Sequence, residues 1–427
     1  MKRPTIILGA GSVIEIGAPS TDKITEEITK PNKYENFIGL SFYATKQYFT
    51  ATSKVYELLK AKYPAKPNFE QVFHVLELLG SYGRVWNIEN KNPDIYSVIA
   101  PFINPTQGVI KPEEWYNLSS LIKSCQLDIM SMINEYDSDY AVKKSTEFSW
   151  YNDFWNKFKN FDLFNFNYDT TIERSLDKYV DGFVDSDDER FQAFSPKTLF
   201  EDNCLCKICH PHGCIVYYDA RYKDMNHDVY EYNFHDLYKW KNYKMVQQMS
   251  IGSSGSNPTT QSGEELHIGS IITGLRKTDK LTISPYNYYH HYLNSSVMKN
   301  SSLLIIGYSF GDLYVNDLVE RMNLLHGDKK RIVVITYIPY DEFVESDGII
   351  TKTFHGKDFE MGSINHREFL FFKKMMHDDS FEFKDLDKTI DDQDSFTSDN
   401  GQLKLFVYGF KSAVEKHGDE IIKFLTE

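Results

Sequence analysis

The sequence predicts an α/β fold in which helices flank a mostly parallel β-sheet. Apolar runs of the strand type recur at 5–8, 161–166, 207–209 and 302–306, and each ends at once in glycine or polar residues. The first two runs lead into helical patterns, which is typical of strand–helix units. A region with helical periodicity, about 35–160, separates them and predicts a large helical insertion. Because ligands bind beyond the carboxyl ends of parallel strands, the four ends are expected to share one site.

The elements follow in order. Residues 5–30 indicate a strand, a glycine turn and a helix, and the Pro-Ser-Thr-Asp segment at 19–22 supplies N-cap chemistry for that helix. Within the insertion, apolar residues at 55–59 and 69–79 recur at helical spacing. Residues 161–180 return to strand and then helix, and 332–337 is a further buried-type strand.

Three polar segments interrupt these elements. We expect a solvated acidic loop at 185–189, a flexible Gly/Ser-rich loop at 249–263 and a loop or linker at 377–400. Residues 403–425 predict one amphipathic helical stretch, too short for a domain of its own, so it packs on the main body or serves an oligomer contact. The predicted division is a domain over 1–340 and an extension over 341–427.

Composition bounds the function. The chain has 427 residues, 41% of them hydrophobic, and a formal net charge of -14. This charge argues against a dedicated nucleic-acid surface, so nucleic acid is expected only through a partner. No apolar run approaches the roughly 20 residues that span a bilayer, and the N-terminal apolar stretch is too short for a signal peptide. The expected location is the cytoplasm.

The turn Gly9-Ala10-Gly11 follows the first strand and is the candidate dinucleotide site. Glycines let the backbone approach a pyrophosphate, and the next helix N-terminus attracts its negative charge. The alternative is an ordinary tight turn.

Asn167, Tyr168 and Asp169 follow the second strand, and a helix bearing Glu173 comes next. An Asx turn with a helix cap at Asp169 is the alternative to a functional role. His212 lies two residues after His210, where the third strand ends. Imidazole suits a general base because its pKa of about 6.5 lies near neutrality.

The fourth strand runs into Gly307, Tyr308, Ser309, Phe310, Gly311 and Asp312. These residues also satisfy Gly-x-Ser-x-Gly, so a hydrolase with Ser309 as nucleophile stays open. Its acid and base would come from Asp341, Asp347, His355, His366 and His377.

Cys204, Cys206 and Cys209 precede the histidines, and Cys214 follows them. Two separated CxxC pairs are absent, so we expect reduced, half-buried cysteines and no metal site.

Taken together, and in this chain order, the four segments resemble the sirtuin-like family of NAD-consuming enzymes. The resemblance covers roughly residues 5–340. It includes the Gly-Ala-Gly turn with the later Gly17-x-Pro19, the Asn-x-Asp pair, the His-Gly and the Gly-x-Ser. Two departures concern the first segment: Val13 stands where the family has a small hydroxyl residue, and Ser20-Thr21-Asp22 replaces Asp-Phe-Arg. These departures and the missing zinc pairs point away from protein deacylation.

The resemblance implies a Rossmann-like sheet and NAD as a consumed substrate, with no zinc. It implies catalytic roles for three residues: Asn167 orients the water, His212 acts on the ribose hydroxyls and Asp169 organises the site. It implies that the dinucleotide is bound by Gly9, Ala10, Gly11, Thr21, Asp22, Gly307, Ser309, Phe310 and Asp312.

The expected reaction is hydrolysis of the nicotinamide–ribose bond, because bacterial relatives of this branch commonly deplete NAD in antiphage defence. Such enzymes are held inactive until triggered, so we expect a homo-oligomer or a separately encoded partner such as a HerA-type ATPase. An NAD- or ADP-ribose-binding sensor without turnover, or a nuclease subunit of a defence complex, stays open as an alternative.

Overall fold

The structure is a computed structural model that describes the central sheet and the helices that flank it. It describes residues 2–31, 33, 51–62, 66–87, 118–187, 189–201, 205–219, 237–250, 269–275, 277–281, 283–337, 342–346, 349–354, 357–360, 395–398 and 400–427. Most of the predicted loop at 249–263 and of the predicted linker at 377–400 lies outside these residues, as does Cys204.

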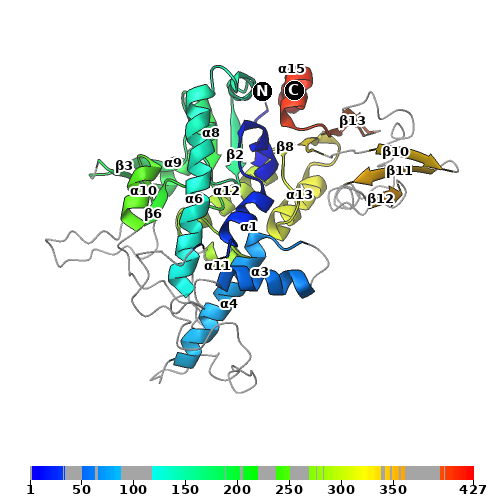
Figure 1. Ribbon diagram of the computed structural model, residues 1–427. Helices are drawn as coiled ribbons and strands as arrows, with labels where there is room; N and C mark the ends of the chain where they lie inside the picture. Colours follow the sequence, from blue (N-terminus) through cyan, green and yellow to red (C-terminus); the bar gives the residue numbers. More distant parts are fainter. Residues whose placement is uncertain are drawn as a thin grey trace.

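A seven-stranded sheet forms the centre of the molecule (Figure 1). Its order is β13-β14-β9-β8-β1-β2-β5, and only β13 is antiparallel to its neighbour. The strands are β1 (Thr5–Leu8), β2 (Phe161–Asn165), β5 (Cys206–Cys209), β8 (Ser302–Ile306), β9 (Arg331–Ile335), β13 (Ser395–Thr397) and β14 (Leu403–Phe406). The predicted Rossmann-like α/β class, with a mostly parallel sheet flanked by helices, is confirmed.

The register of this sheet aligns the ends of the strands. Leu8 pairs with Asn165 on one side and with Ile306 on the other, and Phe164 pairs with Cys209. The segments that follow β1, β2, β5 and β8 therefore leave the sheet at the same edge. The strand order also reverses between β1 and β8, since the chain first builds outward to β2 and β5 and then returns. This switch point is where open α/β sheets form a ligand crevice.

The helical insertion lies between β1 and β2. In Figure 1 the long helix α6 runs alongside α1, with α3 and α4 below; α4 contacts α1, α3 and α6, and α6 contacts α8. The helices of this part are η1 (Ala10–Ser12), η2 (Ile14–Ile16), α1 (Thr21–Ile28), α3 (Ala51–Lys62), α4 (Phe69–Asn87), α6 (Leu118–Lys143), α7 (Ser149–Asn156) and α8 (Thr171–Ser175). Ser20 caps α1 as predicted, because its hydroxyl accepts from the amide of Lys23.

Helices cover both faces of the sheet. Tyr292 of α12 donates to Asp162 of β2 at 2.7 Å, whereas Trp155 of α7 packs against Phe161, the preceding residue of that strand. Because successive strand residues point to opposite faces, α12 and α7 lie on opposite sides. The later helices are α9 (Pro196–Phe200), α10 (Tyr243–Ser250), α11 (Lys277–Lys280), α12 (Tyr286–Lys299), α13 (Leu313–His326), η6 (Gly327–Lys329) and α15 (Phe410–Thr426).

Two antiparallel sheets accompany the central one. The first has the order β3-β4-β7-β6 and the second β10-β11-β12. Their strands are β3 (Phe183–Asp185), β4 (Phe191–Phe194), β6 (Tyr217–Asp219), β7 (Leu237–Trp240), β10 (Glu342–Ser346), β11 (Ile349–Phe354) and β12 (Lys357–Glu360). No helix in the described part of the chain is long and apolar enough to cross a membrane.

The single helix predicted over 403–425 is wrong at its beginning. β14 extends the main sheet beside β9, and the helix starts only at Phe410, after Gly409 with a φ of +90°. The side chain of Glu15, in η2, accepts hydrogen bonds from the amides of Phe410 at 2.7 Å and Lys411 at 2.8 Å. α15 packs on α7, β8 and β9. Residues beyond 340 thus contribute to the same sheet and bond to the turn after β1.

Candidate functional site

The turns after β1 and β8 are packed backbone against backbone. A Cβ added at Gly9 would lie 2.6 Å from the carbonyl oxygen of Gly307, and one added at Gly307 would lie 2.2 Å from the amide nitrogen of Ser12. The amide of Gly11 donates to the carbonyl of Gly307, and that of Gly9 donates to Ile306, both at 2.9 Å. The glycines are therefore required for the approach of the two turns, and the amides of Gly9 and Gly11 are used inside the protein.

Other amides of these two turns have no partner in the backbone that the structure describes. Ala10, Ser309 and Gly311 are exposed, and their amides make no backbone–backbone hydrogen bond among the described residues. Phe310 between them has a φ of +52°, and its carbonyl accepts from Nδ2 of Asn316 at 2.8 Å. A non-glycine residue in this region costs roughly 1–3 kcal/mol and is often found at functional sites. Such a turn suits the binding of an anionic group.

Ser309 does not form a catalytic triad with any described residue. Its hydroxyl makes no hydrogen bond within the described part of the chain, and the positive φ belongs to Phe310 and not to the serine. The downstream residues that could complete a triad lie outside the described residues, namely Asp341, Asp347, His355, His366 and His377.

Asn167 ties the end of β2 to the turn after β1. Its Nδ2 donates to the carbonyl of Gly9 at 3.1 Å and to the hydroxyl of Ser12 at 3.0 Å. Its side chain is 8% exposed. Oδ1 accepts no hydrogen bond among the described residues, so the amide is oriented by its nitrogen and its oxygen remains available to a ligand or water.

Asp169 is fully buried in the core. Its Oδ1 accepts from the amide of Thr171 at 3.0 Å and from that residue's hydroxyl at 2.5 Å, the geometry of an Asx turn at the start of α8. Its Oδ2 is buried and has no hydrogen-bond partner. Burial, and then the charge of Asp169, raise the pKa of Tyr136 well above the usual value. The geometry gives Asp169 a part in building the loop.

His212 and Asp312 meet across the switch point. Nε2 of His212 lies 3.3 Å from Oδ2 of Asp312, and the ring packs edge-on against Phe166 with centroids 4.7 Å apart. Nε2 is buried without a hydrogen bond of good geometry. Oδ1 of Asp312 accepts from the amide of Tyr314 at 2.9 Å, which fixes the carboxylate at the start of α13.

The protonation states of this pair differ from those of free side chains. Burial, followed by the positive charge of Lys277, lowers the pKa of His212 to about 3, although the nearby carboxylate favours the charged ring. Burial raises the pKa of Asp312, but its contact with His212, the amide of Val315 and the charge of Lys277 outweigh burial and bring it to about 2. At neutral pH the pair is a neutral imidazole beside a carboxylate.

His210 has a structural role close to the His212–Asp312 pair. Its Nε2 lies 2.7 Å from Oε1 of Glu173, and both side chains are buried. Burial opposes a charge on His210, but the interaction with Glu173 raises its pKa. Nδ1 lies 3.4 Å from the carbonyl oxygen of Asn167. This ion pair holds the end of β5 against α8 and so supports the loop that carries Asn167.

The segment 269–281 connects His212 to the helical insertion. The amide of Ile272 donates to the carbonyl of His212 at 2.8 Å. From α4, Oε1 of Glu70 lies 3.1 Å from Nζ of Lys277, and Glu77 forms a buried ion pair with Lys280. The insertion therefore places the cation that lowers the pKa of His212.

Thr21 and Asp22 are not brought together with His212 and Asp312. Asp22 forms an exposed ion pair with Lys66 at 3.0 Å, and the carbonyl of Thr21 accepts from the hydroxyl of Thr25 at 2.7 Å. Both residues belong to the first turn of α1, away from the contacts of His212 described above.

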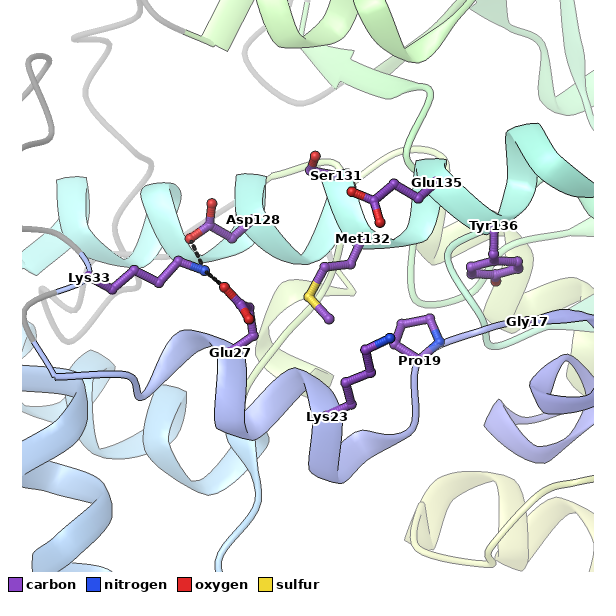
Figure 2. A pocket seen from close by; sticks show the side chains of 10 residues that line it. All are labelled: Gly17, Pro19, Lys23, Glu27, Lys33, Asp128, Ser131, Met132, Glu135 and Tyr136. Atoms are coloured by element: carbon purple, nitrogen blue, oxygen red, sulfur yellow. Dashed lines mark hydrogen bonds and ion pairs between the residues drawn. The ribbon is translucent and has the colours of Figure 1, made fainter.

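A pocket of about 340 Å³ lies between α1 and α6 (Figure 2). Gly17 and Pro19 line it, and Nζ of Lys33 contacts Oε1 of Glu27 at 2.8 Å and Oδ2 of Asp128 at 3.0 Å. None of the predicted catalytic side chains lines this pocket.

The cysteines near the histidines are more deeply buried than predicted. Cys206, Cys209 and Cys214 are free and buried rather than half-buried, and burial raises the pKa of each thiol. No group of three or more His, Cys, Asp or Glu side chains in the described ranges could hold a metal ion.

Sequence reasoning missed two residues at this site. Lys277 comes from a four-residue helix, and His290 from α12, beside Asp312 and His212. Neither follows a strand, so no strand-end pattern indicates them. The pairing of Asp312 with His212 was also not predicted, because Asp312 was assigned to nucleotide binding alone.

Part of the chain matches a known protein family. Residues 162–351 match the family model described as SIR2-like domain. The matched region contains Asn167, His212 and Asp312 and begins after the glycine turn of β1. Domains of this kind use NAD, so the match supports a sirtuin-like, NAD-dependent protein. A comparison with curated proteins gave no match.

Proposed function

We propose that this protein is an NAD⁺ hydrolase that cleaves the nicotinamide–ribose bond. The observation that carries the proposal is the His212–Asp312 pair at the switch point, 3.3 Å apart, within the SIR2-like match. Asn167 lies at the neighbouring strand end, with its amide nitrogen held by Gly9 and Ser12.

Backbone amides of the turns after β1 and β8 support the binding of a dinucleotide. Ala10, Ser309 and Gly311 are exposed residues whose amides have no backbone partner among the described residues, and such amides suit pyrophosphate oxygens. Oδ1 of Asn167 accepts no hydrogen bond among the described residues, which suits a water or a hydroxyl of the nicotinamide-side ribose.

The reaction uses the neutral imidazole. Water attacks the anomeric carbon as the bond to nicotinamide breaks, and nicotinamide leaves with the bonding electron pair while positive charge spreads over the ribose ring. Oδ1 of Asn167 orients the water, and His212 accepts a hydrogen bond or proton from a ribose hydroxyl. The carboxylate of Asp312 stabilises the imidazolium as it forms. The products are nicotinamide, ADP-ribose and one proton.

We further propose that this activity depletes NAD in antiphage defence, under the control of self-association or of a HerA-type ATPase. The resemblance to bacterial sirtuin-like defence proteins supports this role. Exposed apolar side chains support a contact with another chain: Leu324 and Leu325 of α13 are 67% and 56% exposed, and Met298 of α12 is 46% exposed. A hydrogen bond between His326 and the carbonyl of Val297 joins these two helix ends.

One observation favours a second function, an NAD- or ADP-ribose-binding sensor without turnover. A general base works best when its pKa lies near the operating pH, and the pKa of His212 is lowered to about 3. A neutral imidazole with so low a pKa still accepts hydrogen bonds well, which is sufficient for binding.

The test is nicotinamide release from NAD by wild type, Asn167→Ala and His212→Ala, with ADP-ribose binding measured by calorimetry. Turnover in wild type that is lost in both variants supports the hydrolase. Binding without turnover supports the sensor, provided that the assay is repeated with lysate from infected cells to supply a partner. If wild type shows neither NAD turnover nor ADP-ribose binding, the proposal is contradicted.

A further inference from the structure

His290 is a buried histidine whose ring makes no hydrogen bond. It lies in the second turn of α12 and is 5% exposed. Neither Nδ1 nor Nε2 has a hydrogen-bond partner, and the ring packs edge-on against Tyr314 with centroids 5.2 Å apart. Leaving a buried donor or acceptor unbonded is unfavourable, and native proteins rarely do so without a functional reason.

The surroundings of His290 are those of the proposed catalytic pair. Its ring centroid lies 6.5 Å from that of His212, and the two planes are tilted by 31°. The Asp312 carboxylate and the carbonyl of Pro211 are near enough to favour its protonated form, yet burial dominates and lowers its pKa to about 4. Two neutral imidazoles thus lie near each other beside Asp312, and both ring nitrogens of His290 are unbonded.

We propose that His290 is a substrate-contacting residue that acts with His212 to hold the two vicinal hydroxyls of the nicotinamide-side ribose. This inference rests on the proposed function, because it specifies how that site recognises the sugar. Because Nε2 of His212 faces Asp312, that ring offers its Nδ1 to a ligand, whereas the unbonded ring of His290 offers one donor and one acceptor. Two adjacent rings therefore complement a vicinal diol, and a ligand with a single hydroxyl leaves one ring unbonded.

A purely structural role for His290 predicts a different outcome. If the ring only filled space, His290→Leu would leave ligand binding intact. If it stabilised the fold, the same change would lower the melting temperature. Because the ring nitrogens are unbonded in the free protein, we expect His290→Leu to keep or raise the melting temperature, since an apolar side chain carries no unsatisfied polar group.

The experiment compares wild type, His290→Leu and His290→Asn, with His291→Leu as the matched control. His291 is the exposed neighbour on the same helix. ADP-ribose binding is measured by calorimetry, and nicotinamide release is measured with NAD and with NAD analogues that lack either hydroxyl of the nicotinamide-side ribose. We expect His290→Leu to weaken ADP-ribose binding about tenfold and to raise KM more than it changes kcat. His290→Asn should restore part of the affinity.

The deoxy analogues give the sharpest readout. With the analogue that lacks the hydroxyl contacted by His290, the KM of wild type and the KM of His290→Leu should differ little, because the interaction is already absent. Equal ADP-ribose affinity in wild type and His290→Leu would overturn the inference while turnover in wild type left the proposed function standing. A lowered melting temperature in His290→Leu with unchanged affinity per folded molecule would also overturn it. A wild type that neither binds ADP-ribose nor releases nicotinamide would remove both proposals.

Discussion

Glu70 and Lys277 form an ion pair that spans two distant parts of the chain, with Oε1 and Nζ 3.1 Å apart. Glu70 belongs to the helical insertion, whereas Lys277 lies in the segment that bonds to the backbone of His212. The amide of Gly274 also donates to Oε2 of Glu70 at 2.5 Å. The insertion therefore helps to set the electrostatic surroundings of the site, besides covering the sheet.

The first prediction concerns Lys277. Its charge lowers the pKa of His212, after burial, so Lys277→Gln should raise that pKa. His212 would then take up its proton at a higher pH, and the acidic limb of the rate profile for NAD hydrolysis should move upward in pH. Lys423→Gln, at the exposed end of α15, is the control. An unchanged limb, or one moved to lower pH, would show that Lys277 does not act on His212.

The second prediction concerns Asp312. Asp312→Asn removes the carboxylate that stabilises the imidazolium, and kcat should fall by about 10² or more, as is usual when acid–base catalysis is impaired. Asparagine caps helices as well as aspartate does, so α13 should keep its cap and the melting temperature should change little. The measurement is nicotinamide release together with thermal unfolding. A fall in kcat with parallel loss of folded protein would point to capping instead of catalysis.

The third prediction concerns the close approach of the two glycine turns. In Gly307→Ala the new Cβ would lie 2.2 Å from the amide nitrogen of Ser12, and the φ of +59° disfavours any side chain. We expect a loss of about 3 kcal/mol in the free energy of unfolding, by overpacking and strain together. Gly311→Ala is the matched control, because its Cβ would come no closer than 3.6 Å to Ser309. The measurement is denaturant unfolding of both variants. Equal stability of Gly307→Ala and Gly311→Ala would argue against the close packing of the two turns.

The fourth prediction is a pH dependence of stability. The pKa of His290 is about 4 in the folded protein, lowered by burial, and about 6.5 in an unfolded chain. Between these values the unfolded state binds one proton more, so stability rises with pH and is lost as the pH falls from about 6.5 towards about 4. Wild type should lose about 1.4 kcal/mol per pH unit more than His290→Asn. Urea unfolding at about pH 7 and about pH 5 tests this, and parallel losses would contradict it.

Much of the sheet could be predicted from the sequence, because each strand of its centre is a short, mainly apolar segment followed by glycine or polar residues. The runs ending at Leu8, Asn165, Cys209 and Ile306 became neighbouring strands of one sheet, in register at their ends. Local pattern failed at β14, where Leu403, Leu405 and Phe406 are equally compatible with a strand or with the first turn of an amphipathic helix. Only the pairing with β9, which is a tertiary contact, decides between them.

The functional site, too, could be predicted from the sequence only in part. Backbone turns such as Gly307 are visible in the sequence because glycine has few substitutes at a positive φ. The direction in which a side chain points is not visible, and Asp169 shows this: its buried carboxylate accepts from the amide and hydroxyl of Thr171 at the start of α8. Lys277 and His290 act through space from helices, where no pattern distinguishes them from solvent-facing or core residues.

The cap that Glu15 provides to α15 also has a consequence for the order of synthesis. The carboxylate and the amide of Phe410 are separated by 395 positions in the chain. During translation, the turn that follows β1 leaves the ribosome long before the helix that bonds to it, and contacts of such separation form late. A polypeptide still being made thus carries the glycine turn without its final support. The proposed activity would therefore be delayed until most of the chain had been synthesised.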